Sequence, residues 1–351
     1  MPQSRHIAVI GAGISGIACA RTLLQAGHRV KLFEKGAIVG GRTATRSSPF
    51  GGFDHGAQYF TVRDPRFDRA LQTVPGLCKP WSASTVRVLD DHGAVAAAGL
   101  PARESHWVPT PGMNALAQAW AQPLAERQCL ALETRVTRIA QDPGSPRRWQ
   151  LHTVGPDTES GHQRRRFTGF DAVLLAIPAW QAGELLQNSE LAEQLVQRIQ
   201  TVHVAPCWTL MLAFPQAMQP AFSTLGPQWN AARSTHHRIA WLARESSKPG
   251  REPVERWTVQ ASAAWSREHF ADDPGRVQDK LLKAFSEVTG IRAEPAYAAV
   301  HRWAYAQTET PLGKSHLWDA RSGLGACGDW CIGHRVENAF VSGLELALAS
   351  V

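Results

Sequence analysis

The chain opens with a short apolar segment that runs directly into a glycine-rich turn. Residues 6–10 (HIAVI) are apolar and β-rich, and Gly11, Gly13 and Gly16 follow with GxGxxG spacing. Residues 14–27 then place apolar side chains at helical spacing. In this context Gly11 permits a tight turn, Gly13 lets the backbone approach a pyrophosphate, and Gly16 lets helix and strand pack closely. The opening therefore predicts a nucleotide-binding strand–turn–helix unit.

An acidic residue closes this unit. Residues 30–33 form a second apolar strand that ends at Glu34, where a carboxylate can accept hydrogen bonds from ribose hydroxyls. The free N–H groups at the start of the helix favour a phosphate. NAD and FAD both fit this pattern. Residues 39–60 favour FAD, because they form a glycine-rich loop where a nicotinamide dehydrogenase usually continues with βα repeats.

The bulk composition limits the class of protein. The chain has 351 residues, of which 44% are hydrophobic, enough for a large core or two domains. No apolar run approaches the roughly 20 residues of a membrane helix, and the first residues lack a secretory apolar segment. We therefore expect a cytoplasmic protein with no membrane partner.

Cysteines and charges also restrict the partners. The six cysteines are scattered without a CxxC pair, which favours reduced thiols and no metal site. The formal charge of +7 suits anionic partners such as nucleotides. Because the basic residues are dispersed, we expect no nucleic-acid partner. The one compact run, residues 164–166, is interpreted as the exposed flank of a hairpin whose turn spans residues 155–161.

The pattern of elements changes along the chain. We expect helices over residues 65–77 and 113–124, and one strand buried on both faces over residues 167–177. Beyond residue 185 the strands become longer and alternate. The sequence predicts an α/β fold with a Rossmann-like FAD-binding domain and an inserted α+β substrate domain on a mostly antiparallel sheet. We assign 1–75, 108–180 and 307–351 to the first domain, and 76–107 and 181–306 to the second. Within the second domain, paired strands are expected over 84–99.

Several motifs carry a family resemblance. Glu34-Lys35 followed by Gly40-Gly41-Arg42 resembles the signature of the flavin-containing amine oxidase superfamily. FDHGAQY over residues 53–59 resembles its second glycine loop beside the flavin. Gly328-Asp329 resembles its last FAD motif, in which the aspartate meets the ribityl chain and a helix beginning near Val336 points at the flavin.

Within the superfamily, the chain is more similar to bacterial renalase-like proteins. The segments that carry this likeness are FDHGAQYFTVRDPRF, PGMNALAQAWA, FDAVLLAIPAWQA, HRWAYA and GDWCIGHRVENAF. His334 and Asn338 depart from it, because they stand where glycine is expected. These two departures concern the pocket at the edge of the flavin ring.

The resemblance implies a set of cofactor contacts. FAD is expected to bind non-covalently, with Cys331 as the residue for a covalent link if one exists. The implied FAD-binding residues are Gly11, Ala12, Gly13, Ile14, Ser15, Gly16, Glu34, Lys35, Gly41, Arg42, His55, Gly56, Ala57, Gln58, Tyr59, Val136, Gly328, Asp329, Arg335 and Val336.

The resemblance also implies the reaction. FAD would take a hydride from a small substrate and pass electrons to molecular oxygen, giving hydrogen peroxide, without a protein nucleophile. Amine oxidases carry a lysine near the flavin and an aromatic residue in the tail, whereas here the matching places hold Pro206 and Arg335. A cation would repel a protonated amine and suit an anionic dinucleotide. We therefore expect a renalase-like substrate, the 2- or 6-dihydro isomers of NAD(P).

A flat aromatic slot would suit such a substrate. The candidate pocket residues are Trp241, His301, Trp303, Tyr305, Trp208 and Arg335, with His236, His237 and Arg302 as further anchors for a carboxamide or phosphate. Core packing is the alternative for each aromatic residue. Two other functions stay open: an oxidase or dehydrogenase of amines or another small substrate, and a flavoprotein that binds a partner without turnover.

Overall fold

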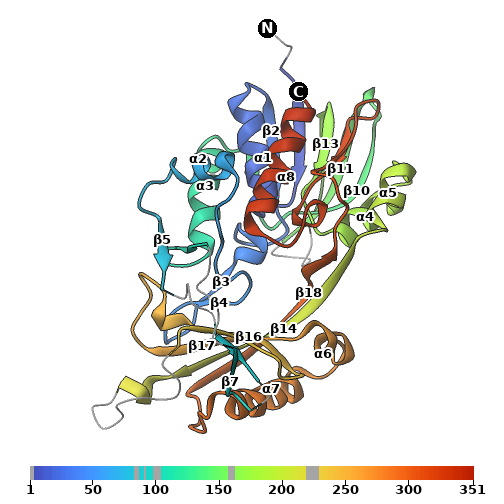
Figure 1. Ribbon diagram of the computed structural model, residues 1–351. Helices are drawn as coiled ribbons and strands as arrows, with labels where there is room; N and C mark the ends of the chain where they lie inside the picture. The colour runs from blue at the N-terminus through green and yellow to red at the C-terminus, as the bar shows by residue number, and fades with distance from the viewer. Residues whose placement is uncertain (1–3, 83–86, 91, 98–103, 157–162, 219–228) are drawn as a thin grey trace.

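The structure, a computed structural model, describes residues 4–82, 87–90, 92–97, 104–156, 163–218 and 229–351. Figure 1 shows one body of sheet and helices in its upper half and a second sheet in its lower half. Two long antiparallel strands, β14 (His203–Phe214) and β18 (Tyr297–Thr310), run from the lower body toward the upper one (Figure 1).

A six-stranded sheet forms the centre of the upper body. Its strand β1 pairs in parallel with β2 and β13, as a strand–helix–strand unit requires. Alternate residues of β1 enter two different cores: Ile7 and Val9 face one side, and Ala8 and Ile10 face the other. In order across the sheet the strands are β19 (Leu317–Asp319), β20 (Leu324–Ala326), β13 (Ala172–Leu175), β1 (His6–Ile10), β2 (Arg29–Phe33) and β9 (Leu130–Ala131).

Helices and a second small sheet cover the two faces. The Ile7 side packs against α1 (Ile14–Gln25), α2 (Pro65–Leu71), α3 (Asn114–Glu126) and α8 (Val336–Ala349). The Ile10 side packs against α4 (Ala179–Asn188), α5 (Glu193–Ile199) and an antiparallel sheet of β10 (Arg135–Asp142), β11 (Ser145–Gly155) and β12 (Gln163–Phe170).

The lower body is a seven-stranded, mostly antiparallel sheet. One face packs on α6 (Ala263–Glu268) and the amphipathic α7 (Pro274–Thr289), through residues such as Trp257 and Phe285. Asp273 caps α7 by accepting the N–H groups of Gly275 and Arg276. After β18 and β14 the order is β17 (Glu255–Ala261), β16 (Ile239–Arg244), β15 (Ala231–Ser234), β6 (Arg87–Leu89) and β7 (Val95–Ala97).

Several short elements complete the fold. They are the strand pairs β3 (Thr45–Arg46) with β4 (Phe53–Asp54) and β5 (Cys78–Trp81) with β8 (His106–Pro109), and the 3-10 turns η1 (Gly41–Thr43), η2 (Pro215–Met218), η3 (Glu245–Ser247) and η4 (Asp329–Cys331). In the described part of the chain, no helix combines the length and apolarity needed to cross a membrane.

The fold confirms the predicted α/β class and corrects two elements. The expected single strand over 167–177 is two strands in different sheets, because the Asp171 carboxylate accepts the His6 N–H at 2.7 Å and turns the chain between β12 and β13. The helix expected over 65–77 ends at Leu71. The ring of Pro75 would clash with the Leu71 carbonyl if the helix continued.

The basic run and the expected strand pair are also located. Residues 164–166 are exposed on β12, in an antiparallel hairpin with β11. Strands β6 and β7 pair as expected. Residues 84–86, 91 and 98–99 of that expected pair, and residues 157–161 of the expected turn, lie outside the described residues.

Candidate FAD and substrate site

The glycine turn after β1 has the shape of a phosphate cradle. Gly11 has φ of +102°, and a Cβ there would lie 2.5 Å from the Ala176 oxygen. A Cβ on Gly16 would lie 1.8 Å from the Gly11 oxygen, so α1 and β1 could not pack as they do. A Cβ on Gly13 would meet no atom within 4 Å, which leaves open space beside the uncapped N-terminus of α1. This is the arrangement that a pyrophosphate requires.

Glu34 lies at the end of β2, on the edge of the same cavity. Its two carboxylate oxygens accept the N–H groups of Ala12 and Gly36, each at 2.8 Å. An ionised carboxylate has about four lone-pair sites, so it can still accept hydrogen bonds from a ribose. Lys35 and Val136 line the cavity beside it. The ribose of an adenosine would fit at this end of the cavity.

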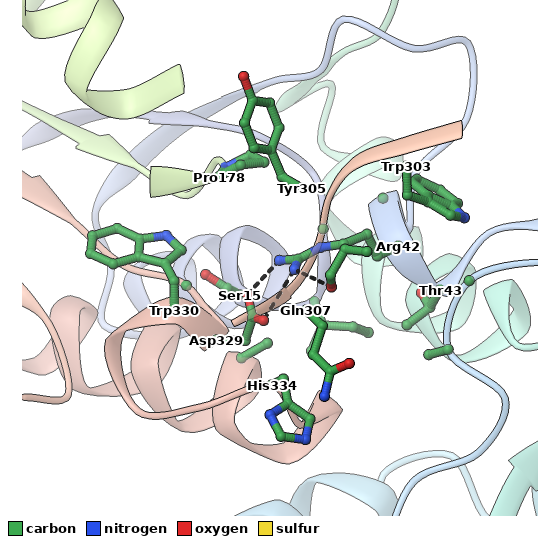
Figure 2. Close-up of a pocket in the computed structure, with 18 of the residues that line it drawn as sticks. Ser15, Arg42, Thr43, Pro178, Trp303, Tyr305, Gln307, Asp329, Trp330 and His334 are labelled. Atoms are coloured by element: carbon green, nitrogen blue, oxygen red, sulfur yellow. Dashed lines mark hydrogen bonds and ion pairs between the residues drawn. The ribbon is translucent and has the colours of Figure 1, made fainter. Parts of the chain in front are cut away.

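Arg42 and Asp329 meet in the middle of the cavity. The guanidinium donates to both carboxylate oxygens, one of them at 3.1 Å, and to the Ala306 carbonyl at 3.2 Å. Thr308 donates its hydroxyl to Asp329 at 3.3 Å. Figure 2 shows this pair between Trp303 and Tyr305 above and His334 below. Arg42 and Asp329, which belong to motifs far apart in the sequence, therefore form an ion pair that joins η1 to η4. Ala306 and Thr308 connect this pair to β18.

A loop of residues 55–59, which follows β4 and is here called the wall loop, bounds the cavity beyond Arg42. The Ala57 N–H donates to the Arg42 carbonyl at 2.9 Å, and a Cβ on Gly56 would lie 2.1 Å from that same oxygen. Gly56, Ala57, Gln58 and Tyr59 all line the cavity. The wall loop is therefore pressed onto the glycine–arginine turn.

His55, the first residue of the wall loop, does not line the cavity. Burial, and then the nearby His301, lower its pKa to about 4. Its carbonyl accepts the Trp303 indole N–H at 2.9 Å, and its ring stacks on Trp303 with centroids 5.1 Å apart. His55 therefore supports an aromatic residue of the cavity as a neutral ring.

The start of α8 also opens into the cavity. Its N-cap residue Arg335 has extended backbone and makes no side-chain cap, and His334, Arg335 and Val336 line the cavity. Asn338 does not line it and instead donates to the Gly333 carbonyl at 3.1 Å. Of the two departures from the family pattern, only His334 thus shapes the cavity.

The structure separates the aromatic candidates. Trp241, Trp303 and Tyr305 line the cavity. Trp208 does not: it is 2% exposed in the core against α7, and its indole N–H donates to the His269 carbonyl at 3.0 Å. His301 lies behind Trp303, with ring centroids 4.4 Å apart. Core packing, the alternative stated for each aromatic residue, describes Trp208.

Of the three further anchors, Arg302 alone lines the cavity. His236 is buried and forms a hydrogen bond with Glu287, and the ring of His237 stacks on the ring of His236.

Three of the expected FAD-binding residues do not line the cavity: Ala12, Gly16 and His55. Each of them positions residues that do line it. Several lining residues had no sequence signal, because they lie outside the quoted motifs: Arg233, Gln260, Glu184, Gln307 and Cys207.

The tail cysteines lie outside this lining. Cys327 and Cys331 are fully buried, and burial raises the pKa of the Cys327 thiol to about 12 and that of Cys331 as well. Neither is an activated thiolate. Across the described ranges, no group of three or more histidine, cysteine or acidic residues could hold a metal.

The size of the cavity fits FAD and leaves further room. Its volume is about 1620 Å³, above the roughly 300–1,000 Å³ of a pocket for one drug-sized ligand. An extended dinucleotide along Glu34, Gly13 and Arg42 would leave space near Trp241 and Tyr305. The residues present therefore fit FAD, and the remaining part of the cavity can admit a second molecule.

Comparisons with known proteins agree with this geometry. Residues 99–348 match the family "Flavin containing amine oxidoreductase", and residues 9–74 match "NAD(P)-binding Rossmann-like domain". A cyclohexylamine oxidase from Brevibacterium oxydans IH-35A has the same fold, with a TM-score of 0.70, 14% identity and 99% coverage of both chains. A redesigned putrescine oxidase gives a TM-score of 0.67 with 12% identity, covering 99% of this chain and 98% of its own.

Curated relatives match over short segments only. An L-amino-acid oxidase from Siganus canaliculatus is 43% identical over 42 residues, 12% of this chain and 8% of the relative. A 4,4'-diaponeurosporene oxygenase from Staphylococcus aureus is 37% identical over 60 residues, 17% of this chain and 12% of the relative. The chain thus aligns with about a tenth of their length. The family match covers more than half of the chain: the protein belongs to the flavin-containing amine oxidoreductase family and is an FAD-dependent oxidoreductase.

Proposed function

We propose that the protein is a renalase-like oxidase that returns 2- or 6-dihydro isomers of NAD(P) to NAD(P)⁺. Bound FAD supplies the hydride acceptor and passes the electrons to oxygen, which leaves as hydrogen peroxide. The chain's own residues have to bind an anionic dinucleotide, orient its ring and keep water out.

Arg335 is the observation that carries this proposal. It lines the cavity at the N-terminus of α8, and no ion pair to its side chain occurs among the described residues. The hydrogen bond from Arg63 lowers the pKa of the Glu104 carboxyl, and the charge of Arg335 adds to this effect; Glu104 is, however, already paired with Arg63. A guanidinium beside a helix N-terminus is complementary to a phosphate or carboxamide oxygen. The same charge would repel a protonated amine.

The strand expected to carry a lysine supports the same conclusion. Pro206 and Cys207 of β14 line the cavity, at a bulge in its pairing with β18. Proline has no N–H and no basic group. Burial raises the pKa of the Cys207 thiol to about 11, so this residue stays neutral at physiological pH. We therefore assign no protein base to this strand.

Aromatic surfaces can orient a nicotinamide ring. Trp303 and Tyr305 project from β18 on the same side of the Arg42–Asp329 pair (Figure 2), and Trp241 lines the cavity with its ring 5.7 Å from that of Tyr59. Flat rings of this kind hold a conjugated substrate by stacking. A cytoplasmic location, where such dinucleotides occur, is part of this proposal.

The decisive experiment is anaerobic reduction of the FAD-loaded protein. We expect 2- or 6-dihydro-NAD(P) to bleach the visible flavin band, and peroxide to form when oxygen is admitted. Rapid bleaching by simple amines, with no response to the dihydronicotinamides, would instead establish amine oxidation. A flavin that no substrate reduces would indicate a binding protein without turnover.

A charge variant tests the role of Arg335. Arg335→Gln removes one charge-assisted hydrogen bond, worth about 1.5–3 kcal/mol, so the Kd for the dinucleotide product should rise about 10- to 100-fold. Arg321→Gln, an exposed position in the turn after β19, is the matched control and should bind as the parent does. Unchanged product affinity in Arg335→Gln would remove Arg335 from the site.

A further inference from the structure

A cluster of buried charges adjoins the wall loop, and none of its four side chains lines the cavity. The side chains of Asp54, Glu245 and Lys248 are 0% exposed, and that of Arg251 is 1% exposed. Burying charges is costly, and a buried ion pair often adds no net stability over apolar side chains of similar volume. Stability alone therefore gives no reason for this cluster, whereas fixed geometry does.

Lys248 uses all of its hydrogen-bonding capacity inside the cluster. Its ammonium group lies 3.1 Å from Asp54 Oδ2, 3.1 Å from Gln58 Oε1 and 3.0 Å from Glu245 Oε1. An ammonium has three donors, so each has one acceptor. The contact with Gln58 also decides which end of that amide is the oxygen.

Asp54 anchors the cluster to the upper body. Its Oδ1 accepts the Thr45 hydroxyl at 2.7 Å and the Met113 N–H at 2.8 Å, and its Oδ2 accepts Arg251 at 2.7 Å in addition to Lys248. The carboxylate therefore joins β3 and the start of α3 to the segment after η3. Lys248 and Arg251 hold its pKa below the usual range.

Gln58 transmits this anchoring to the wall loop. Its amide nitrogen donates to the Asp54 carbonyl and, at 3.3 Å, to the Gly56 carbonyl. Gln260 donates to the same Gly56 carbonyl at 2.7 Å. Because both carbonyls accept hydrogen bonds from the Gln58 amide, the orientation of the peptide groups in the wall loop depends on the Gln58 side chain.

We infer that Lys248 is a positioning residue of the FAD site, which acts through Gln58 to hold the wall loop against the ring end of the cofactor. The adenosine end of the cavity is at Glu34 and the phosphate cradle is at Gly13, so the ring end lies beyond Arg42, where the wall loop lies. This inference rests on FAD binding and is independent of which substrate is oxidised.

A double-mutant cycle with spectroscopic readouts tests this. The variants are Lys248→Met, Gln58→Leu and the double variant, with Lys283→Met, 71% exposed on α7, as the control. The measurements are the visible spectrum and midpoint potential of bound FAD, the Kd of FAD, and urea unfolding. We expect both single variants to shift the spectrum and potential in the same direction and to raise the Kd about tenfold, as for one lost charge-assisted hydrogen bond.

The cycle separates positioning from mere structural support. If Lys248 acts through Gln58, the double variant matches Gln58→Leu in spectrum and potential, because the two effects are not additive. Strict additivity would overturn the inference. So would a Lys248→Met protein that unfolds at lower urea but keeps the parent spectrum and potential. If Lys248→Met does not fold, Lys248→Met with Glu245→Gln leaves no bare carboxylate, because Asp54 keeps its ion pair with Arg251. An unchanged spectrum in Gln58→Leu alone is also sufficient to reject the inference.

Discussion

Replacing Glu34 by glutamine is the sharpest test of the adenosine end of the site. Each carboxylate oxygen accepts one backbone N–H at 2.8 Å, from Ala12 and from Gly36. A glutamine amide has one oxygen, so it can accept only one of these donors. Its NH₂ group would face the other N–H. Glu34→Gln preserves the shape of the side chain, and yet it should weaken FAD binding almost as much as Glu34→Ala does.

The magnitude follows from the contacts. Each hydrogen bond to a charged group contributes about 1.5–3 kcal/mol, and the ribose adds one or two such bonds when FAD is bound. Since Glu34 is only half-buried, we take the lower part of this range. The free energy of unfolding of the FAD-free protein should fall by about 1.5–2 kcal/mol, and the Kd of FAD should rise about 10- to 100-fold.

The assay is reconstitution of FAD-free protein, followed by flavin fluorescence, with urea unfolding in parallel. Glu126→Ala on the exposed face of α3 is the control. Glu34→Gln could instead bind FAD as tightly as the parent while Glu34→Ala does not. The shape of the side chain, and not its two carboxylate acceptors, would then determine FAD affinity, and the reasoning would be refuted.

Three further outcomes are expected. Gly16→Ala places a Cβ 1.8 Å from the Gly11 oxygen, so thermal or urea unfolding should show a loss of about 3 kcal/mol or more and little FAD binding; parent-like stability would contradict the packing. The pKa of His55 is about 4 in the folded protein against 6.5 unfolded. The unfolded state thus binds more protons between these values, and stability should decline by about 2–3 kcal/mol as pH falls from 6.5 to 4; unfolding of His55→Phe followed against pH should lack this slope. Denaturation should release all flavin into solution, and flavin that stays with the chain would implicate a covalent link such as one to Cys331.

The local elements and the cofactor could be predicted from the sequence because their causes are local. The glycine spacing and the apolar runs of β1 and β2 need only neighbouring residues to specify strand, turn and helix, and Glu34 ends that unit by its place in the chain. Strands β14, β16 and β17 and helix α7 likewise follow from periodicity. The family motifs that contain Arg42 and Asp329 predicted FAD as the cofactor, although the sequence did not show that these two residues contact each other.

What the tertiary structure decided is which of many similar residues meet. Trp208 and Trp303 lie on paired strands of one sheet, yet Trp208 enters the core against α7 and Trp303 lines the cavity. The separation of β12 from β13 at Asp171 depends on the backbone N–H of His6, which lies 165 residues earlier in the sequence. Lys248 meets Asp54 only because η3 folds behind the wall loop. Contacts between such distant segments depend on how sheets and helices pack, and no periodicity or spacing within the chain records that packing.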